Sequence, residues 1–189
     1  HSFRLIVSLC YCCGLRKSEA VSLKIKDIDF QTGKINILNS KRDVSRIIVV
    51  SSSLLKIMEK YYNDYCTGYG KDDWFIQNSK GGAYCKATLY KLYHELLEKA
   101  GIPERSDGRI HRLHDMRHAF CVHTLEQMQA KGFDLYTSLP LLSVYLGHKH
   151  ITETEYYLRL VDECHSSMLD QSARYCPSVF PEEVDDNEN

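Results

Sequence analysis

The sequence predicts an α+β domain that is mostly α-helical and carries one small three-stranded antiparallel sheet. Apolar residues recur at helical spacing in several segments, most clearly in SSSLLKIMEKYYNDYC and KATLYKLYHELLEKAG. Three short β-like runs, KDIDF, KINIL and RIIVV, follow one another between residues 26 and 50 and are joined by polar segments. A chain of 189 residues is long enough for one domain with a sizeable core.

The helices can be placed in order along the chain. Residues 3–13 have helical apolar spacing up to Gly14, and the segment SEAVSL begins a short second helix just after Arg16. Of the two helices quoted above, the first opens with serine caps and the second ends at a glycine. A long helix is expected from about His114 to Lys131, followed by shorter ones in SLPLLSVYLG, TETEYYLRL and DECHSSMLDQSARY.

The composition, 43% apolar and 26% charged, is that of an ordinary globular protein, and no apolar run of about 18 residues is present to cross a bilayer. The net charge of −1 includes five acidic residues in the tail PEEVDDNEN, so residues 1–180 carry 24 basic against 20 acidic residues. This mild excess is weak support for a nucleic-acid partner. Eight cysteines in a chain of this size indicate reduced thiols and a cytoplasmic protein.

Ionisable residues are densest in the segment RIHRLHDMRH. On a helix, His114, Arg117 and His118 share one face because they are three and four residues apart. Two histidines at this spacing can bind zinc, although Arg117 would place a permanent cation beside the metal. A solvated basic helix face is a second interpretation. The third is phosphate recognition, since arginine offers a rigid fork for two oxygens and histidine adds a hydrogen bond.

Three other segments offer the same chemistry. GLRKSE contains Arg16 before a helix, NSKRDVSR contains Lys41, and LGHKHITETEYY contains His148 with Tyr157 nine residues later. Cationic and proton-donating groups together with a tyrosine are what a metal-free attack on a phosphodiester needs. The non-bridging oxygens must be held, the leaving oxygen needs a proton, and a hydroxyl must act as the nucleophile.

These segments resemble, in their order along the chain, the motifs of the tyrosine recombinases, also called phage integrases. GLRKSE is similar to the family's Gly-Leu-Arg-x-Ser-Glu, HDMRH to its His-x-x-Arg box, and LGHKHITETEYY to its Leu-Gly-His box with a tyrosine nine residues on. Glu19 is the acid beside the first arginine, and Arg46 follows the hairpin lysine at the start of a strand. The resemblance implies the catalytic-domain fold of that family and a catalytic set of Arg16, Lys41, His114, Arg117, His148 and Tyr157.

The resemblance also implies how these residues act on DNA. Tyr157 is expected to attack a phosphate and form a 3′-phosphotyrosyl link. Arg16 and Arg117 would hold the non-bridging oxygens, and Lys41 would protonate the departing 5′-oxygen. Both histidines of the catalytic set would add hydrogen bonds, with His114 the candidate acceptor of the tyrosine proton.

Two residues next to the catalytic set are expected to support it. His118 lies inside the matched box and is interpreted as a supporting residue, as is Glu19. Tyr156 stands about 100° from Tyr157 around any helix that they share. We therefore expect Tyr156 to be the packed anchor that aims the nucleophile.

The domain limits follow from the same resemblance. Residues 1–175 are expected to form the catalytic domain, without the core-binding domain that precedes it in the family, and residues 176–189 to form an acidic flexible tail. Arg117 and His148 are 31 residues apart, more than in compact family members, so an elaborated loop is expected at QAKGFDLYTSLP. The segment VDECHSSMLDQSARY is expected to be a helix that docks on a neighbouring protomer or on its own domain.

The predicted function is site-specific DNA recombination in the integration or excision of a mobile element. The expected partner is double-stranded DNA, bound by a homo-tetramer in the synaptic complex, with accessory DNA-bending proteins and a monomeric free fragment. We expect no cofactor, no metal and no membrane, and a location in the bacterial cytoplasm, at the nucleoid when DNA is bound. The alternatives are a type IB topoisomerase, a non-cleaving DNA-binding module and, more remotely, a zinc hydrolase.

Overall fold

The computed structural model describes residues 2–38 and 45–158 of the chain. The elements of these ranges are α1 (Ser2–Cys12), α2 (Lys17–Ser22), the 3₁₀ turn η1 (Ile25–Asp27), β1 (Ile28–Asp29), β2 (Lys34–Ile37), β3 (Arg46–Val49), α3 (Ser52–Tyr65), α4 (Lys86–Lys99), α5 (Asp115–Ala130) and α6 (Leu135–Leu146). Residues 152–158 add a final helical segment. Lys41, the segment VDECHSSMLDQSARY and the acidic tail lie outside the described residues.

The sheet has the predicted antiparallel arrangement. Within the described ranges it consists of three strands in the order β1-β2-β3, with Ile28 opposite Ile35 and Ile35 opposite Ile48. Because successive side chains of a strand point to opposite faces, Ile35, Ile37 and Ile48 are buried while their neighbours are exposed or partly exposed. The run KDIDF is only partly strand, since it starts within η1.

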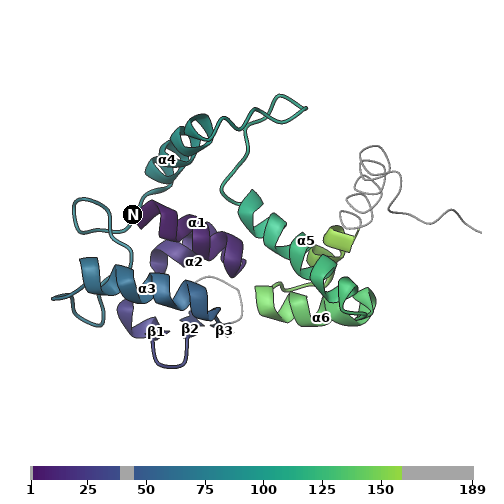
Figure 1. Cartoon of the computed structure of the whole chain (residues 1–189), viewed down its shortest axis with the longest axis horizontal. Coiled ribbons are helices and arrows are strands. Elements are labelled where there is room, and N and C mark those ends of the chain that lie inside the picture. The colour runs from purple at the N-terminus through teal and green to yellow at the C-terminus, as the bar shows by residue number, and fades with distance from the viewer. Residues whose placement is uncertain (1, 39–44, 159–189) are drawn as a thin grey trace, which may run out of the picture.

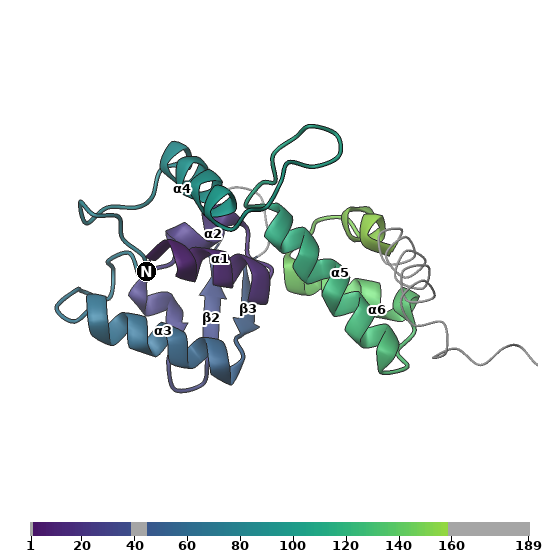
Figure 2. The same ribbon diagram turned by 45° about the horizontal axis from the view of Figure 1, so that its top comes forward.

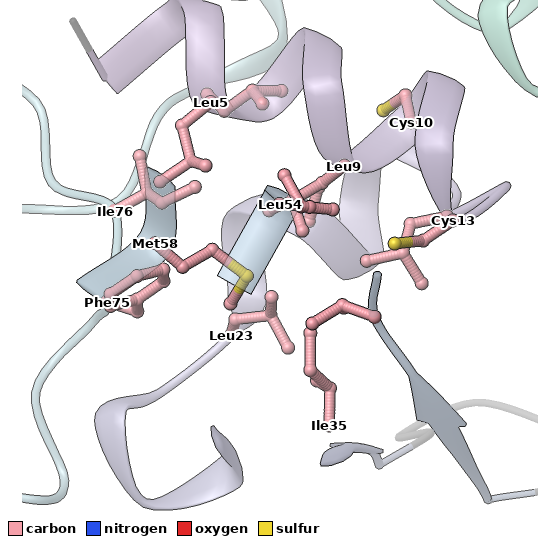
Figure 3. Close-up of a cluster of buried hydrophobic side chains, with 14 of the residues drawn as sticks. Leu5, Leu9, Cys10, Cys13, Leu23, Ile35, Leu54, Met58, Phe75 and Ile76 are labelled. Carbon is pink, nitrogen blue, oxygen red and sulfur yellow. The ribbon is translucent and has the colours of Figure 1, made fainter. Parts of the chain in front are cut away.

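The first hydrophobic cluster joins α1, α3 and the sheet. Figure 3 shows Leu5 and Leu9 of α1, Met58 of α3 and Ile35 of β2 within this cluster, and each is at most 3% exposed. The helical spacing of Leu5 and Leu9, four residues apart, places both on the buried face of α1. This cluster therefore fixes the end of α1, after which Arg16 follows.

A second hydrophobic cluster lies between α5 and α6. Leu125 of α5 packs with Leu142 and Leu146 of α6, and Tyr157 of the last helical segment belongs to the same cluster. Figures 1 and 2 show α5 and α6 as a pair beside the group formed by α1, α2, α3 and the sheet. Tyr145 is partly buried against both clusters, so the two groups of elements meet at the end of α6.

The ends of α6 correct one expectation. Asp134 caps this helix by accepting a hydrogen bond from the backbone N–H of Thr137, and Gly147 ends it in the left-handed conformation at φ +67°. Only residues 131–134 separate α5 from α6, so the expected elaborated loop at QAKGFDLYTSLP is wrong. The cap at Asp134 starts the helix earlier than the run SLPLLSVYLG indicated, and most of the added length is helical.

Candidate active site

The carboxylate of Glu19 is buried among arginines. The short helix α2 places Glu19 three residues after Arg16, where it accepts a hydrogen bond from the Arg16 backbone nitrogen at 2.9 Å and caps the helix. Arg46 donates two further bonds, Nη1 to Oε1 and Nη2 to Oε2, both at 2.9 Å. Burial alone would raise the pKa of Glu19, but the bonds and charges of Arg46 and Arg16 hold it below its usual value. Glu19 is therefore ionised at neutral pH.

Backbone carbonyls hold the guanidinium of Arg117, in the first turn of α5. The residue is 1% exposed; its Nη1 donates to the carbonyl of Gly14 at 2.7 Å and its Nη2 to that of Leu146 at 2.9 Å. Burial and the nearby charge of Arg16 lower the pKa of Arg117. A guanidinium nevertheless stays charged in proteins, so the site contains a buried cation of fixed orientation.

His148 is bonded as a neutral imidazole. Its Nε2 lies 2.9 Å from Nη2 of Arg117, and because a guanidinium has no acceptor, this nitrogen accepts the hydrogen bond. Its Nδ1 then carries the proton and donates to Oγ1 of Thr154 at 2.8 Å. Burial and the positive charge of Arg117 lower the pKa of His148 to about 4, which agrees with a neutral ring at physiological pH.

This arrangement favours the binding of an anion. Arg46 takes up both oxygens of Glu19, while the nearest Glu19 oxygen lies 3.9 Å from Nη1 of Arg117. The side chain of Arg16 is 23% exposed and its Nη2 donates to the carbonyl of Gly147 at 3.3 Å. One carboxylate therefore faces several guanidinium groups, whose forks match the oxygens of a phosphate.

Tyr157 and Tyr156 have opposite environments. Tyr157 is 3% exposed, and its hydroxyl lies 2.8 Å from Nδ1 of His118. Burial raises the pKa of the Tyr157 phenol, so the hydroxyl is protonated at neutral pH. Tyr156 is 56% exposed and only meets the edge of the Tyr157 ring. The expectation that Tyr156 is a packed anchor is wrong, because the helix turns its side chain to the solvent.

The two histidines of the HDMRH motif lie against each other at the start of α5. The ring of His114, which precedes the helix, meets the ring of His118 edge-on at a centroid distance of 4.8 Å. Burial lowers the pKa of His114 to about 4, and the neighbouring His118 and Arg117 add to the effect. It is His118 that forms the hydrogen bond to Tyr157.

The structure thus brings most of the sequence-predicted site residues together. Arg16, Glu19, Arg117 and His148 form one contact network, and His114, His118 and Tyr157 form a second one along α5. Sequence reasoning assigned no role to Arg46, although its position at the start of β3 next to the hairpin loop was a signal. Its contact with Glu19 spans 27 residues and could not be read from local spacing.

Three further properties bear on the expectations from the sequence. Within residues 2–38 and 45–158, no group of three or more His, Cys, Asp or Glu side chains is arranged to hold a metal ion. None of the helices in these ranges combines the length and the apolar character that crossing a membrane requires. The cysteines in the described part of the chain are all free thiols.

The fold consists of helices around a small sheet, and its arginine-rich site lies beside a tyrosine that follows a Leu-Gly-His motif. This combination defines the class of the tyrosine recombinase catalytic domains. Comparison with known proteins agrees. The model of the phage integrase family matches residues 2–163, and the chain belongs to that family.

Individual recombinases resemble the chain in sequence or in fold. The chain is 30% identical over 162 residues to a tyrosine recombinase of Pseudothermotoga lettingae, an alignment that covers 84% of this chain and 50% of the relative. The crystal structure of XerA recombinase matches 90% of this chain and 62% of its own at 22% identity, with a TM-score of 0.68. XerH recombinase bound to its difH substrate before cleavage matches 87% of this chain and 44% of its own at 26% identity, with a TM-score of 0.64. The chain spans about half the length of the curated relatives that it matches.

Proposed function

We propose that the chain is the catalytic domain of a site-specific DNA recombinase, which cleaves and rejoins DNA through a 3′-phosphotyrosyl intermediate. The observation that carries the proposal is the position of Arg117, a buried cation held by two carbonyls and His148, in the same helix turn as the histidine that contacts Tyr157. A fixed cation beside a hydroxyl nucleophile supports attack on a phosphate, because negative charge accumulates on the phosphate oxygens in the transition state.

Each residue of the catalytic set has its own role in strand cleavage. Arg16 and Arg117 hold the two non-bridging oxygens, while Glu19 orients Arg16. Tyr157 attacks the phosphorus, and Lys41, which lies outside the described residues, protonates the departing 5′-oxygen. The histidines of the catalytic set, His114 and His148, supply hydrogen bonds. Because the phosphotyrosyl link conserves the energy of the broken bond, a 5′-hydroxyl can reseal the strand without ATP or metal.

The biological setting follows from this chemistry. The substrate is double-stranded DNA, and strand exchange requires four protomers around two duplexes, with accessory DNA-bending proteins where the site demands them. Integration or excision of a mobile element is the process we favour, and relatives of the chain are named integrase/recombinase. Residues 1–175 form the catalytic domain in this proposal, with residues 176–189 as an acidic tail, and the reaction takes place in the cytoplasm on nucleoid DNA.

The test is covalent capture of DNA. The chain, within its full-length protein, is incubated with nicked suicide duplexes made from the DNA that flanks its gene, and the protein–DNA adduct is scored on denaturing gels. We expect an adduct from wild type and from Tyr156→Phe, and none from Tyr157→Phe. An adduct from Tyr157→Phe but not from Tyr156→Phe would overturn the choice of nucleophile. Binding without any wild-type adduct would favour a non-cleaving DNA-binding module.

A further inference from the structure

The hydroxyl of Tyr157 is hydrogen-bonded to His118. Its oxygen lies 2.8 Å from Nδ1 of His118, and the two rings are 5.6 Å apart between centroids at an interplanar angle of 47°. Both residues are shielded from water, since Tyr157 is 3% exposed and His118 is partly buried in α5. This distance is that of an ordinary hydrogen bond made by a hydroxyl group.

The direction of this hydrogen bond can be deduced. The phenol of Tyr157 has a raised pKa and is a donor at neutral pH, whereas burial lowers the pKa of His118 below its usual value of about 6.5. His118 is therefore neutral, and its Nδ1 accepts the phenol proton. The Cys121 thiol, one turn along α5, also contacts Tyr157, but its pKa is raised by burial to about 11, so it remains protonated and is a poor acceptor.

We propose that His118 is the catalytic base of strand cleavage, the group that takes the proton of Tyr157 as the tyrosine attacks the phosphate. This inference rests on the proposed phosphotyrosyl reaction. It gives to His118 the role for which the sequence favoured His114, whose ring meets His118 edge-on.

Strand cleavage moves two protons and exchanges one phosphorus–oxygen bond for another. The Oη–H bond of Tyr157 breaks, and its proton moves to Nδ1 of His118, which becomes an imidazolium. The Oη–phosphorus bond forms, the bond between phosphorus and the 5′-oxygen breaks, and that oxygen takes a proton from the lysine ammonium. In resealing, a 5′-hydroxyl gives its proton to the lysine amine as it bonds to phosphorus, the Oη–phosphorus bond breaks, and His118 returns its proton to Tyr157. No oxidant, metal or further reactant is needed.

The charges around His118 suit this exchange. The groups that face it are His114, Asp115, Arg105, Arg112, Arg117 and Tyr157. Burial is the largest effect and disfavours a positive charge on the His118 ring. Asp115 favours that charge, while the three arginines oppose it, so the ring is neutral and can accept a proton. A bound phosphate adds negative charge beside Arg117 and makes the imidazolium easier to form at the moment when it is needed.

The test is single-turnover cleavage by the full-length His118→Gln protein on nicked suicide duplexes, with a normal phosphate or with sulfur in place of the 5′-bridging oxygen. A thiolate leaves without a proton, so the sulfur substrate isolates the activation of the nucleophile. We expect His118→Gln to cleave both substrates about 10²- to 10⁴-fold more slowly than wild type. Its rate should rise with pH by about tenfold per unit, because hydroxide must ionise the tyrosine, while the wild-type rate levels off once His118 is neutral.

A matched control is His123→Gln, a histidine on the exposed side of the same helix that contacts Tyr11. It should cleave at the wild-type rate. A second measurement does not depend on the folding of a His118 variant. Arg112→Ala removes an exposed cation and releases Asp115, and both changes should move the inflection of the cleavage rate to higher pH.

Three results overturn the proposal. The first is a His118→Gln protein with wild-type rates and pH profile, and the second is full rescue of that variant by the sulfur substrate, which would place His118 at the leaving group. The third is an Arg112→Ala profile with an unmoved inflection. If the wild-type protein forms no adduct on any duplex, the proposed function itself fails, a result that differs from a defect confined to the variants.

Discussion

Arg46 and Glu19 form a bidentate ion pair that joins the start of β3 to α2, with both hydrogen bonds at 2.9 Å and both side chains at most 7% exposed. Arg46 also donates from Nε to the carbonyl of Tyr145 at 2.7 Å, and the edge of its side chain lies against Gly147. The pair therefore connects the sheet, the first arginine motif and the end of α6.

Removing Arg46 should destabilise the fold. In Arg46→Met, Glu19 stays buried with a weaker partner and the Tyr145 carbonyl loses a donor, so we expect a loss of about 3 kcal/mol in the free energy of unfolding. Urea denaturation followed by circular dichroism measures it. Arg112→Met removes an exposed pair with Asp115 and should cost less than about 1 kcal/mol. Equal losses in the two variants would show that the Arg46 pair contributes no more than a surface pair.

Stability should fall as the pH drops from about 6.5 to about 4. In the folded chain the pKa values of His114 and His148 are lowered to about 4. Between these pH values the two histidines are therefore protonated in the unfolded chain but not in the folded one, which favours unfolding. At still lower pH Glu19, whose folded pKa is also lowered, is protonated and loses its ion pair with Arg46. Melting temperatures measured between pH 7.5 and 4 report this decline. The His148→Gln variant should show a shallower decline between pH 6.5 and 4; a curve parallel to that of the wild type would contradict the prediction.

The sequence predicted much of the fold for physical reasons that are local. Helical spacing and caps located α3, α4 and α5 to within a residue or two, and short runs rich in isoleucine and valine located β2 and β3. The site motifs were also local, so Arg16, Arg117 and His148 could be named. What spacing could not supply was the direction of side chains across the fold.

Three residues illustrate this limit. Tyr156 and Tyr157 stand on different faces of one helix, but which face is inward depends on α5, and the pattern alone assigned the packing role to the wrong one. His118 was given a supporting role, because its contact with Tyr157 connects positions 39 residues apart. Contacts of this length depend on how the two hydrophobic clusters come together.

A side chain at Gly14 should destabilise the fold. It has φ +61°, a Cβ at this position would lie 2.5 Å from Cδ1 of Phe120, and its carbonyl accepts from Arg117. Gly101 has φ +64° and nothing within 4 Å, so Gly101→Ala isolates the cost of the left-handed backbone, about 1–2 kcal/mol. We expect Gly14→Ala to cost about 1–3 kcal/mol more than that by denaturation, because Phe120 must move. Equal costs would show that Phe120 yields freely.

Thr154 should be a positioning residue for His148. It is fully buried, and its hydroxyl accepts the bond that fixes the His148 tautomer. Thr154→Val keeps the shape and removes the acceptor, so adduct formation should slow about tenfold, the equivalent of one hydrogen bond, while affinity for uncleaved DNA stays unchanged. Thr154→Ser should restore the rate, which a purely steric role would not predict. Gel mobility shift and suicide-substrate cleavage provide the two readouts.

The two carbonyls that hold Arg117 belong to different parts of the molecule. Gly14 follows α1, which packs on α5, α2 and α3, and Leu146 ends α6, which packs on α5. The guanidinium of Arg117, on α5, thus connects the chain after α1 to the end of α6. A shift of α1 relative to α5 and α6 would therefore change the bond to Gly14 and leave the bond to Leu146 in place. Substitutions of Arg117 will accordingly alter unfolding and catalysis together, and the two effects must be measured side by side.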